Sequence, residues 1–189
     1  MGKSASGKDH IYARLAAHEE LGLKKLVLYT TRPIRAEEED GKQYYFVDDK
    51  KLKEFQEKGC VIEARAYHTV HGIWTYFTAD DGQIELWQYD YLVIGTIESY
   101  YALKEYFGDD VMVPLYIEVE DGIRLERAIQ REKKQKEPKY TELCRRFIAD
   151  SKDFSEENIK KSKIEKRFQN IELDKCVDEI IEYLNSQKR

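Results

Sequence analysis

The stretch Gly2-Lys3-Ser4-Ala5-Ser6-Gly7-Lys8 decides the fold of this chain, because it runs directly into a helical pattern that places Ile11 and Leu15 on one face. Its spacing satisfies G-x-x-x-x-G-K, in which a glycine-bearing loop turns backbone N–H groups inward around phosphate oxygens. The positive end of the following helix adds to that field, and Lys8 would reach the β and γ phosphates of a nucleotide. We therefore expect residues 2–8 to form a P-loop, with a flexible N-terminal tail as the alternative.

Two features depart from the usual P-loop. The position that normally carries a Ser or Thr for magnesium is Asp9, whose carboxylate could hold a hard cation directly or through water but adds negative charge beside the phosphates. A P-loop also normally follows a buried strand, and here only Met1 precedes Gly2. Either a few apolar residues are missing upstream or the sheet lacks a strand at its centre.

Composition restricts the class of protein. The 189 residues, 41% of them apolar, suit one domain of ordinary size. Lys and Arg (32) nearly balance Asp and Glu (37), so a net charge of −5 gives no broad basic face for nucleic acid. The pattern M-G-x-x-x-[ST] marks Gly2 as a possible myristoylation acceptor, but no second anchoring signal accompanies it and no stretch is long and apolar enough to span a membrane. Cys60, Cys144 and Cys176 show no paired spacing, so we expect a protein of the reducing cytoplasm.

Along the chain, strand and helix patterns alternate after residue 90, which predicts an α/β sheet. A short strand is expected at Leu26–Thr31, and mixed strands over residues 44–86 indicate an inserted lobe. The other predicted elements are a strand at 44–47, a helix capped by Asp48 and running to Lys58, strands over 61–78 joined near His71-Gly72, strands at 91–94, 112–119 and 167–170, and helices at 98–107, 122–134, 140–153 and from 173 onward.

The segment Thr30-Thr31-Arg32-Pro33-Ile34-Arg35, followed by acidic residues and Asp40-Gly41-Lys42-Gln43-Tyr44, resembles the guanylate kinase signature, and similarity extends over nearly the whole chain. The resemblance implies a P-loop kinase core over 1–31 and 91–189, a GMP-binding lobe over 32–90 and a helical lid near 122–150. It further implies that the chain transfers a phosphoryl group from ATP, held with Mg²⁺, to GMP, and we expect a monomer or a homodimer.

The acceptor site is expected in the lobe. Arg32 and Arg35 follow a strand, where their guanidinium groups could donate paired hydrogen bonds to a phosphate. Tyr44 and Tyr76 supply hydroxyl groups as further donors. By resemblance these four hold the GMP phosphate, and the alternative is that the two arginines only balance the acidic run 37–40. A carboxylate at Glu63 could accept from the two neighbouring N–H groups of guanine, a role that the resemblance also implies.

Three positions affect base specificity. Thr78 can replace a family serine, whereas Leu28 stands where another serine is expected and Thr96 stands where an acid is expected. We still expect Thr96 to bind GMP in the acceptor site. A kinase for a different nucleoside monophosphate is an alternative.

The lid is expected to carry the charge that phosphoryl transfer needs. Arg124, Arg127 and Arg131 share one helix face, and a second helix carries Arg146. Such arginines can follow the γ phosphate while closure excludes water, although a solvated basic face would give the same pattern. By resemblance the catalytic residues are Lys8, Arg127, Arg131 and Arg146; ATP binds Gly2, Lys3, Ser4, Ala5, Ser6, Gly7, Lys8, Asp9 and Asn170; GMP binds Arg32, Arg35, Tyr44, Glu63, Tyr76, Thr78 and Thr96; and Asp9 is the metal ligand. A non-catalytic module that binds a phosphorylated peptide through the same lobe is the remaining alternative.

Overall fold

The chain divides into two compact units in a computed structural model that describes residues 1–35, 38–69 and 72–187. The first unit comprises Met1–Gly22, Ile94–Tyr101 and Met112–Arg189, and the second comprises Leu23–Val93 and Ala102–Val111. Helix α3 (Ile97–Phe107) contributes residues to both. Each unit has its own sheet and its own buried cluster.

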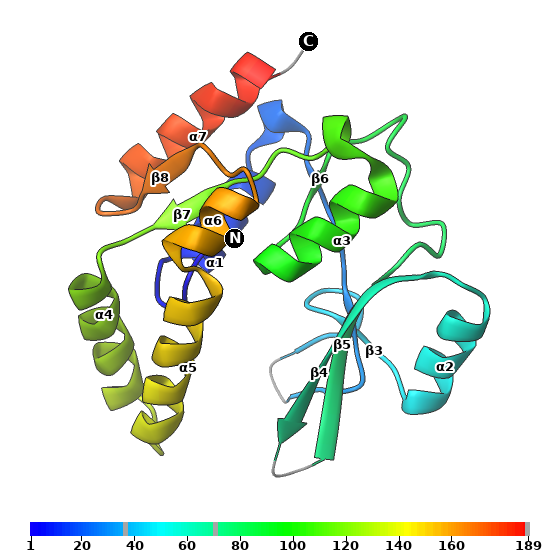
Figure 1. Ribbon diagram of the computed structural model, residues 1–189, viewed down its shortest axis with the longest axis horizontal. Coiled ribbons are helices and arrows are strands. Elements are labelled where there is room, and N and C mark those ends of the chain that lie inside the picture. Colours follow the sequence, from blue (N-terminus) through cyan, green and yellow to red (C-terminus); the bar gives the residue numbers. More distant parts are fainter. Residues whose placement is uncertain (36–37, 70–71, 188–189) are drawn as a thin grey trace. The chain divides into compact units, whose positions relative to one another are not determined.

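The first unit is built on parallel β structure. Strands β7 (Tyr116–Glu118) and β8 (Arg167–Gln169) pair in parallel, and Met1 lies along β7, donating its amine to Leu115 O and accepting from the amide of Ile117. The remaining elements of this unit, seen in Figure 1, are α1 (Lys8–Ala16), the 3₁₀ turn η1 (Glu19–Leu21), α4 (Asp121–Lys133), α5 (Tyr140–Asp153), α6 (Glu156–Lys161) and α7 (Leu173–Gln187). Strands that alternate with helices confirm the predicted α/β class.

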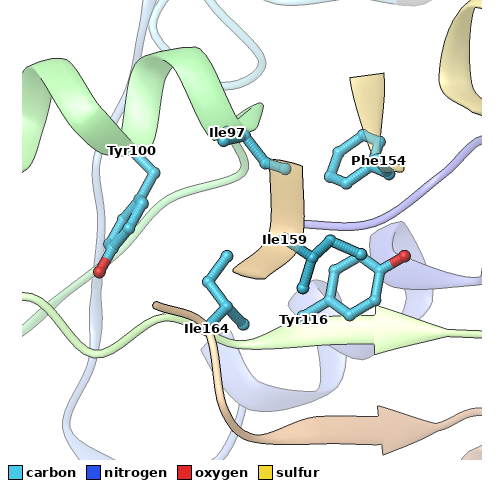
Figure 2. Packing of buried hydrophobic residues seen from close by; sticks show 6 residues of the cluster. All are labelled: Ile97, Tyr100, Tyr116, Phe154, Ile159 and Ile164. Atoms are coloured by element: carbon cyan, nitrogen blue, oxygen red, sulfur yellow. The ribbon is translucent and has the colours of Figure 1, made fainter. Parts of the chain in front are cut away.

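An apolar cluster fixes α5 and α6 against β7. Figure 2 shows Tyr116 of β7 among side chains that come from distant parts of the sequence, including Ile97 at the start of α3 and Ile159 of α6. The rings of Tyr116 and Phe154 stack with centroids 5.7 Å apart, and Phe154 directly follows α5. Burial of each such aromatic or aliphatic side chain stabilises the fold by about 1.5–3 kcal/mol. The end of α5 is therefore anchored to the sheet.

The second unit contains a four-stranded mixed sheet in the order β3-β2-β5-β4. Strands β2 (Tyr29–Thr30) and β3 (Tyr45–Phe46) are parallel, while β5 (Gly72–Ala79) is antiparallel to both β2 and β4 (Val61–Thr69). Figure 1 shows β4 and β5 as one long hairpin. A separate parallel pair is formed by β1 (Lys24–Lys25) and β6 (Tyr91–Leu92), and the 3₁₀ turn η2 covers Asp109–Val111.

The two faces of this sheet differ in chemistry because side chains alternate along a strand. One face is apolar: Tyr29 and Phe77 stack at 5.0 Å and pack with Leu52 of α2 (Asp49–Glu57). Helix α2 begins as predicted, since Asp48 Oδ1 accepts from the amide of Lys51 at 2.7 Å. The opposite face carries polar and aromatic side chains and forms the candidate acceptor site.

Several predicted strands are shorter than expected. The stretch Leu26–Thr31 is not one strand: Leu26 donates to Leu92 O and extends the β1–β6 pair, whereas Tyr29 and Thr30 pair with β3 and β5. The chain thus changes sheets within six residues, which hydrophobicity alone does not reveal. The strand expected over 112–119 is regular only at 116–118, and α6 was not predicted. The turn near His71-Gly72 falls partly outside the described residues.

Among the helices of the described residues, none combines the length and the apolar character that crossing a bilayer requires.

Candidate functional site

The glycine loop has the backbone of an anion-binding turn. Gly7 adopts φ 82° and precedes α1 without any side-chain cap, and Ala5 also has a positive φ of 61°. The first amides of α1 are therefore left to a ligand at the positive end of the helix. Glycine is required at both motif positions because an added Cβ would lie 2.2 Å from Asn170 Nδ2 at Gly7 and 2.5 Å from Ile117 O at Gly2.

Asn170 braces this loop. Its side chain is buried after β8, and its Nδ2 donates to Ser6 O at 2.8 Å. Asn170, which was expected to bind ATP, is thus in contact with the backbone of the P-loop. Nearby, the hydroxyl of Ser6 is buried without a hydrogen-bond partner among the described residues. None of the ion pairs formed within the described ranges includes the half-buried Lys8, so its ammonium is available to an anion.

Helices α4 and α5 both reach the loop at Ser4. Arg124, which is only 1% exposed, donates to Ser4 O at 2.9 Å and to Asp121 Oδ1 at 2.8 Å. From α5, Asp150 Oδ2 accepts from the amide of Ser4 at 2.6 Å. Sequence reasoning placed Arg124 on a basic stripe without assigning it this buried role. Its spacing of four residues from the buried Ala128 is the signal that could have identified it as facing inward.

The three predicted lid arginines are arranged in two groups. Arg146 donates to Ser4 Oγ at 3.0 Å, and Arg131 lines the same small cavity beside Ser4, between α4 and α5. Arg127 instead donates to the backbone oxygens of Asn170 at 3.1 Å and Ile171 at 3.4 Å. The structure therefore brings Arg131 and Arg146 to the loop, while Arg127 joins α4 to the segment after β8.

A metal site made by the protein alone is absent from the described part of the chain, which holds no group of three or more His, Cys, Asp or Glu side chains suited to an ion. Asp9 lies exposed in the first turn of α1, next to Lys8. Mg²⁺ in phosphoryl-transfer sites uses one or two carboxylates and completes its shell with phosphates and water. A single carboxylate at this place fits that pattern when a nucleotide supplies the other ligands.

On the polar face of the lobe sheet, Arg32 is held by a carboxylate. The residue is 3% exposed; its Nε donates to Tyr76 Oη at 3.1 Å, and its Nη1 and Nη2 donate to Glu38 at 2.8 and 2.7 Å. This fork raises the pKa of Arg32 and lowers the pKa of Glu38. Arg32 therefore pairs with a carboxylate of the acidic run 37–40, which was the alternative to its binding a phosphate. Arg35 donates only its backbone amide to Glu38, at 2.9 Å, and its side chain is exposed.

Aromatic rings surround this guanidinium. Tyr44 meets Tyr76 edge-on with centroids 5.4 Å apart, and Tyr67 meets Tyr76 at 5.6 Å. The Arg32 Cζ atom lies 5.8 Å from the ring centroid of Tyr44 and 5.3 Å from that of Phe46. Burial raises the pKa of Tyr44, which keeps its hydroxyl protonated and able to donate. The predicted residues Arg32, Tyr44 and Tyr76 are therefore together.

The carboxylate of Glu63 is buried on the same face. It accepts from Thr78 Oγ1 at 2.8 Å and from Arg65 through Nε at 2.9 Å and Nη2 at 3.3 Å. Arg65 was not predicted, although alternation along β4 places it beside Glu63. Thr96 belongs to the first unit, where its hydroxyl accepts from the amide of Ser99 at 3.2 Å and caps α3.

Comparisons with known proteins find similarity to guanylate kinases. The family model described as guanylate kinase matches residues 1–74. A guanylate kinase of Nitrosomonas europaea is 34% identical over 65 residues, which cover 34% of this chain and 32% of that protein, so the chain spans about a third of the length of the relative it matches. The crystal structure of guanylate kinase from Anaplasma phagocytophilum aligns with a TM-score of 0.63 and 16% identity over 100% of this chain and 84% of the other. The fold predicted from the sequence is confirmed.

Proposed function

We propose that this chain, whose residues 1–74 match the family model described as guanylate kinase and whose whole length takes the fold of a guanylate kinase, transfers the γ-phosphoryl group of ATP to GMP. The observation that carries the proposal is the surroundings of the glycine loop. A half-buried Lys8 without a carboxylate partner among the described residues stands at the open end of α1, and Arg146 contacts Ser4 in the loop. Nothing in the reaction requires a protein nucleophile, since positioning and charge stabilisation supply the catalysis.

On the donor side, the phosphates of ATP bind the loop from Gly2 to Lys8. Backbone amides of the loop and the positive end of α1 donate to phosphate oxygens, and Lys8 balances the charge of the β and γ phosphates. Arg131 and Arg146 approach the same place from α4 and α5 and stabilise the γ phosphate as charge moves off it. Arg127 acts with them by fixing α4 to the Asn170 backbone.

Magnesium accompanies ATP in this proposal, with Asp9 as the protein ligand, directly or through water. Bound there, the ion would neutralise negative charge on the phosphates, which is the chemistry it supplies in kinases of this kind. A carboxylate in place of the usual hydroxyl adds one negative charge beside the phosphates, so the protein's basic side chains must offset it.

On the acceptor side, the phosphate of GMP binds Arg32, Arg35, Tyr44 and Tyr76. Support comes from the convergence of Arg32, Tyr44 and Tyr76 on one face and from the exposed Arg35 side chain at the end of the same loop. The carboxylate of Glu38 occupies the fork of Arg32, so the acceptor phosphate takes its place or shares that fork. Exchange of one anion for another keeps the buried guanidinium paired at every stage.

The base of GMP is read by Glu63 and Thr78. The two N–H groups on the edge of guanine match a carboxylate, whereas adenine offers no such pair. In this proposal the lobe over 32–90 holds GMP, the core over 1–31 and 91–189 holds ATP, and residues 122–150 act as the lid. We place the enzyme in the cytoplasm as a monomer or homodimer, in keeping with three free thiols.

A coupled assay of ADP production with ATP, magnesium and GMP tests the proposal. Turnover should depend on GMP and fall by at least about a thousandfold in Lys8→Ala, because the loop loses its mobile cation. Lys25→Ala, a change at an exposed lysine outside the site, should leave turnover intact. A folded protein that binds GMP without producing ADP would refute the kinase function and favour a binding module.

A further inference from the structure

Arg65 lies on the acceptor face of the lobe, next to the carboxylate that is expected to read the base. Residues 63 and 65 are two positions apart on β4, and successive side chains of a strand point to opposite faces, so these two side chains share one face of the sheet. Across the ladder Arg65 is opposite Tyr76, and Glu63 is opposite Thr78. Arg65 therefore stands between Glu63 and the tyrosine that contacts Arg32.

Glu63 has little acceptor capacity left. A carboxylate offers about four lone-pair sites on its two oxygens. Oε1 already accepts from Thr78 at 2.8 Å and from Arg65 Nη2 at 3.3 Å, and Oε2 accepts from Arg65 Nε at 2.9 Å. A guanine that uses both of its adjacent N–H groups needs one site on each oxygen. The Glu63–Arg65 pair must therefore open partly when guanine binds, and the longer Nη2 bond is the one to give way.

The Nη2 donor of Arg65, once released from Glu63, has an acceptor on the same guanine base. Guanine carries its 6-oxo acceptor directly beside its N1–H donor, so the edge presents an acceptor next to two donors. Glu63 and Arg65 present the complementary order, acceptors next to donors, on neighbouring positions of one strand face. The planar guanidinium is also suited to staying bonded to Glu63 through Nε while an Nη atom donates elsewhere.

We propose that Arg65 is a specificity-determining residue, which donates to the 6-oxo group of the acceptor purine while Glu63 accepts from N1–H and the 2-amino group. This assignment rests on the proposed function, because it takes the lobe face as the site of the acceptor nucleotide. The side chains of Arg65 and Glu63 are only 13% and 5% exposed. Water therefore competes little for either group, and a missing 6-oxo acceptor leaves a buried donor unpaired.

The test compares GMP with 6-thio-GMP, which keeps N1–H and the 2-amino group but replaces the 6-oxo oxygen with sulfur, a weak acceptor. Binding is measured by titration calorimetry without ATP. The unaltered protein should bind GMP about tenfold or more tightly than 6-thio-GMP, as expected for loss of a charged hydrogen bond. In Arg65→Met that ratio should fall to about one, mainly through weaker GMP binding.

Two further variants complete the design. Arg65→Gln keeps a neutral donor and should give an intermediate ratio, and it serves if the Met variant does not fold. Arg14→Met removes an arginine from an exposed pair with Asp174 and should leave the ratio unchanged. Tighter GMP binding in Arg65→Met would overturn the proposal, because Arg65 would then compete for Glu63. An equal loss for both nucleotides, or no binding of either by the unaltered protein, would also overturn it. The expected affinity ratios of GMP to 6-thio-GMP in a protein that shows no turnover would refute only the kinase function.

Discussion

Replacing Glu38 by Gln should destabilise the protein and at the same time make it respond more strongly to GMP. Glu38 accepts two bonds of 2.8 and 2.7 Å from Arg32, whose side chain is 3% exposed, while the side chain of Glu38 itself is 15% exposed. Breaking a buried pair from one side costs about 3–5 kcal/mol because a charge is left buried without compensation. The residual exposure of Glu38 places this case near 3 kcal/mol, or a drop in Tm of roughly 6–12 °C for a chain of this size.

The assay is thermal unfolding with and without GMP, and Glu39→Gln is the matched control. Glu39 lies in the same acidic run but pairs with Lys42 at an exposed site, where such pairs contribute about 0–1 kcal/mol. GMP should raise the Tm of Glu38→Gln more than that of the unaltered protein, because its phosphate restores an anion to Arg32. Equal Tm values for the two variants would refute the burial argument. A smaller GMP shift in Glu38→Gln would show that Glu38 supports the acceptor phosphate.

The same pair predicts a pH dependence. Its hydrogen bonds to Arg32 lower the pKa of Glu38 below that of an ordinary carboxyl group, so the unfolded chain binds the proton more readily. The stability that Glu38 contributes is therefore complete above the ordinary carboxyl pKa of about 4.3 and is lost as the pH falls toward the lower folded value. The difference in unfolding free energy between the unaltered protein and Glu38→Gln should shrink below about pH 4. A constant difference from pH 7 to pH 3 would contradict this.

Three other substitutions have defined outcomes. Gly7→Ala should cost about 1–3 kcal/mol of unfolding free energy and weaken ATP binding, because the residue has φ 82° and its Cβ would lie 2.2 Å from Asn170; unchanged calorimetric affinity for ATP would contradict this. Arg124→Met should lower ATP affinity and should lower stability by about 1.5–3 kcal/mol, because its buried guanidinium donates to Ser4 O and to the half-exposed Asp121, while GMP affinity stays the same. Phe77→Ala, at a side chain with 0% exposure, should cost about 3–5 kcal/mol in urea unfolding, and a loss below 1 kcal/mol would show that the lobe core collapses around the gap.

Local signals in the sequence predicted the elements whose ends are chemically marked. Asp48 caps α2 as expected, and α5 has the predicted bounds 140–153. The α/β class followed from alternation of the two periods. Strand pairing was harder to predict, because Leu26 and Tyr29 both fit the pattern of a single strand but pair in different sheets.

The candidate site shows the same division. A loop defined by its own spacing, Gly2 to Lys8, could be found from the sequence, as could the arginine and tyrosines that meet on the lobe face. Arg65 was missed because no motif contains it, although its position two residues after Glu63 placed both on one face. The spacing from Ala128 could have shown that Arg124 faces inward, but its partner Ser4 lies 120 residues away in the sequence, and no local pattern identifies that partner.

The close approach of Gly2 to β7 has a consequence for how nucleotide binding can be observed. The amide of Ile117 donates to Met1 O at 2.9 Å, and its carbonyl oxygen lies where a Gly2 side chain would be. The loop and the strand can therefore separate only if this amide opens to solvent. Hydrogen exchange at the amide of Ile117 would then report the local opening of the loop, because its acceptor, Met1 O, belongs to the residue directly before Gly2. ATP should slow that exchange in proportion to its occupancy.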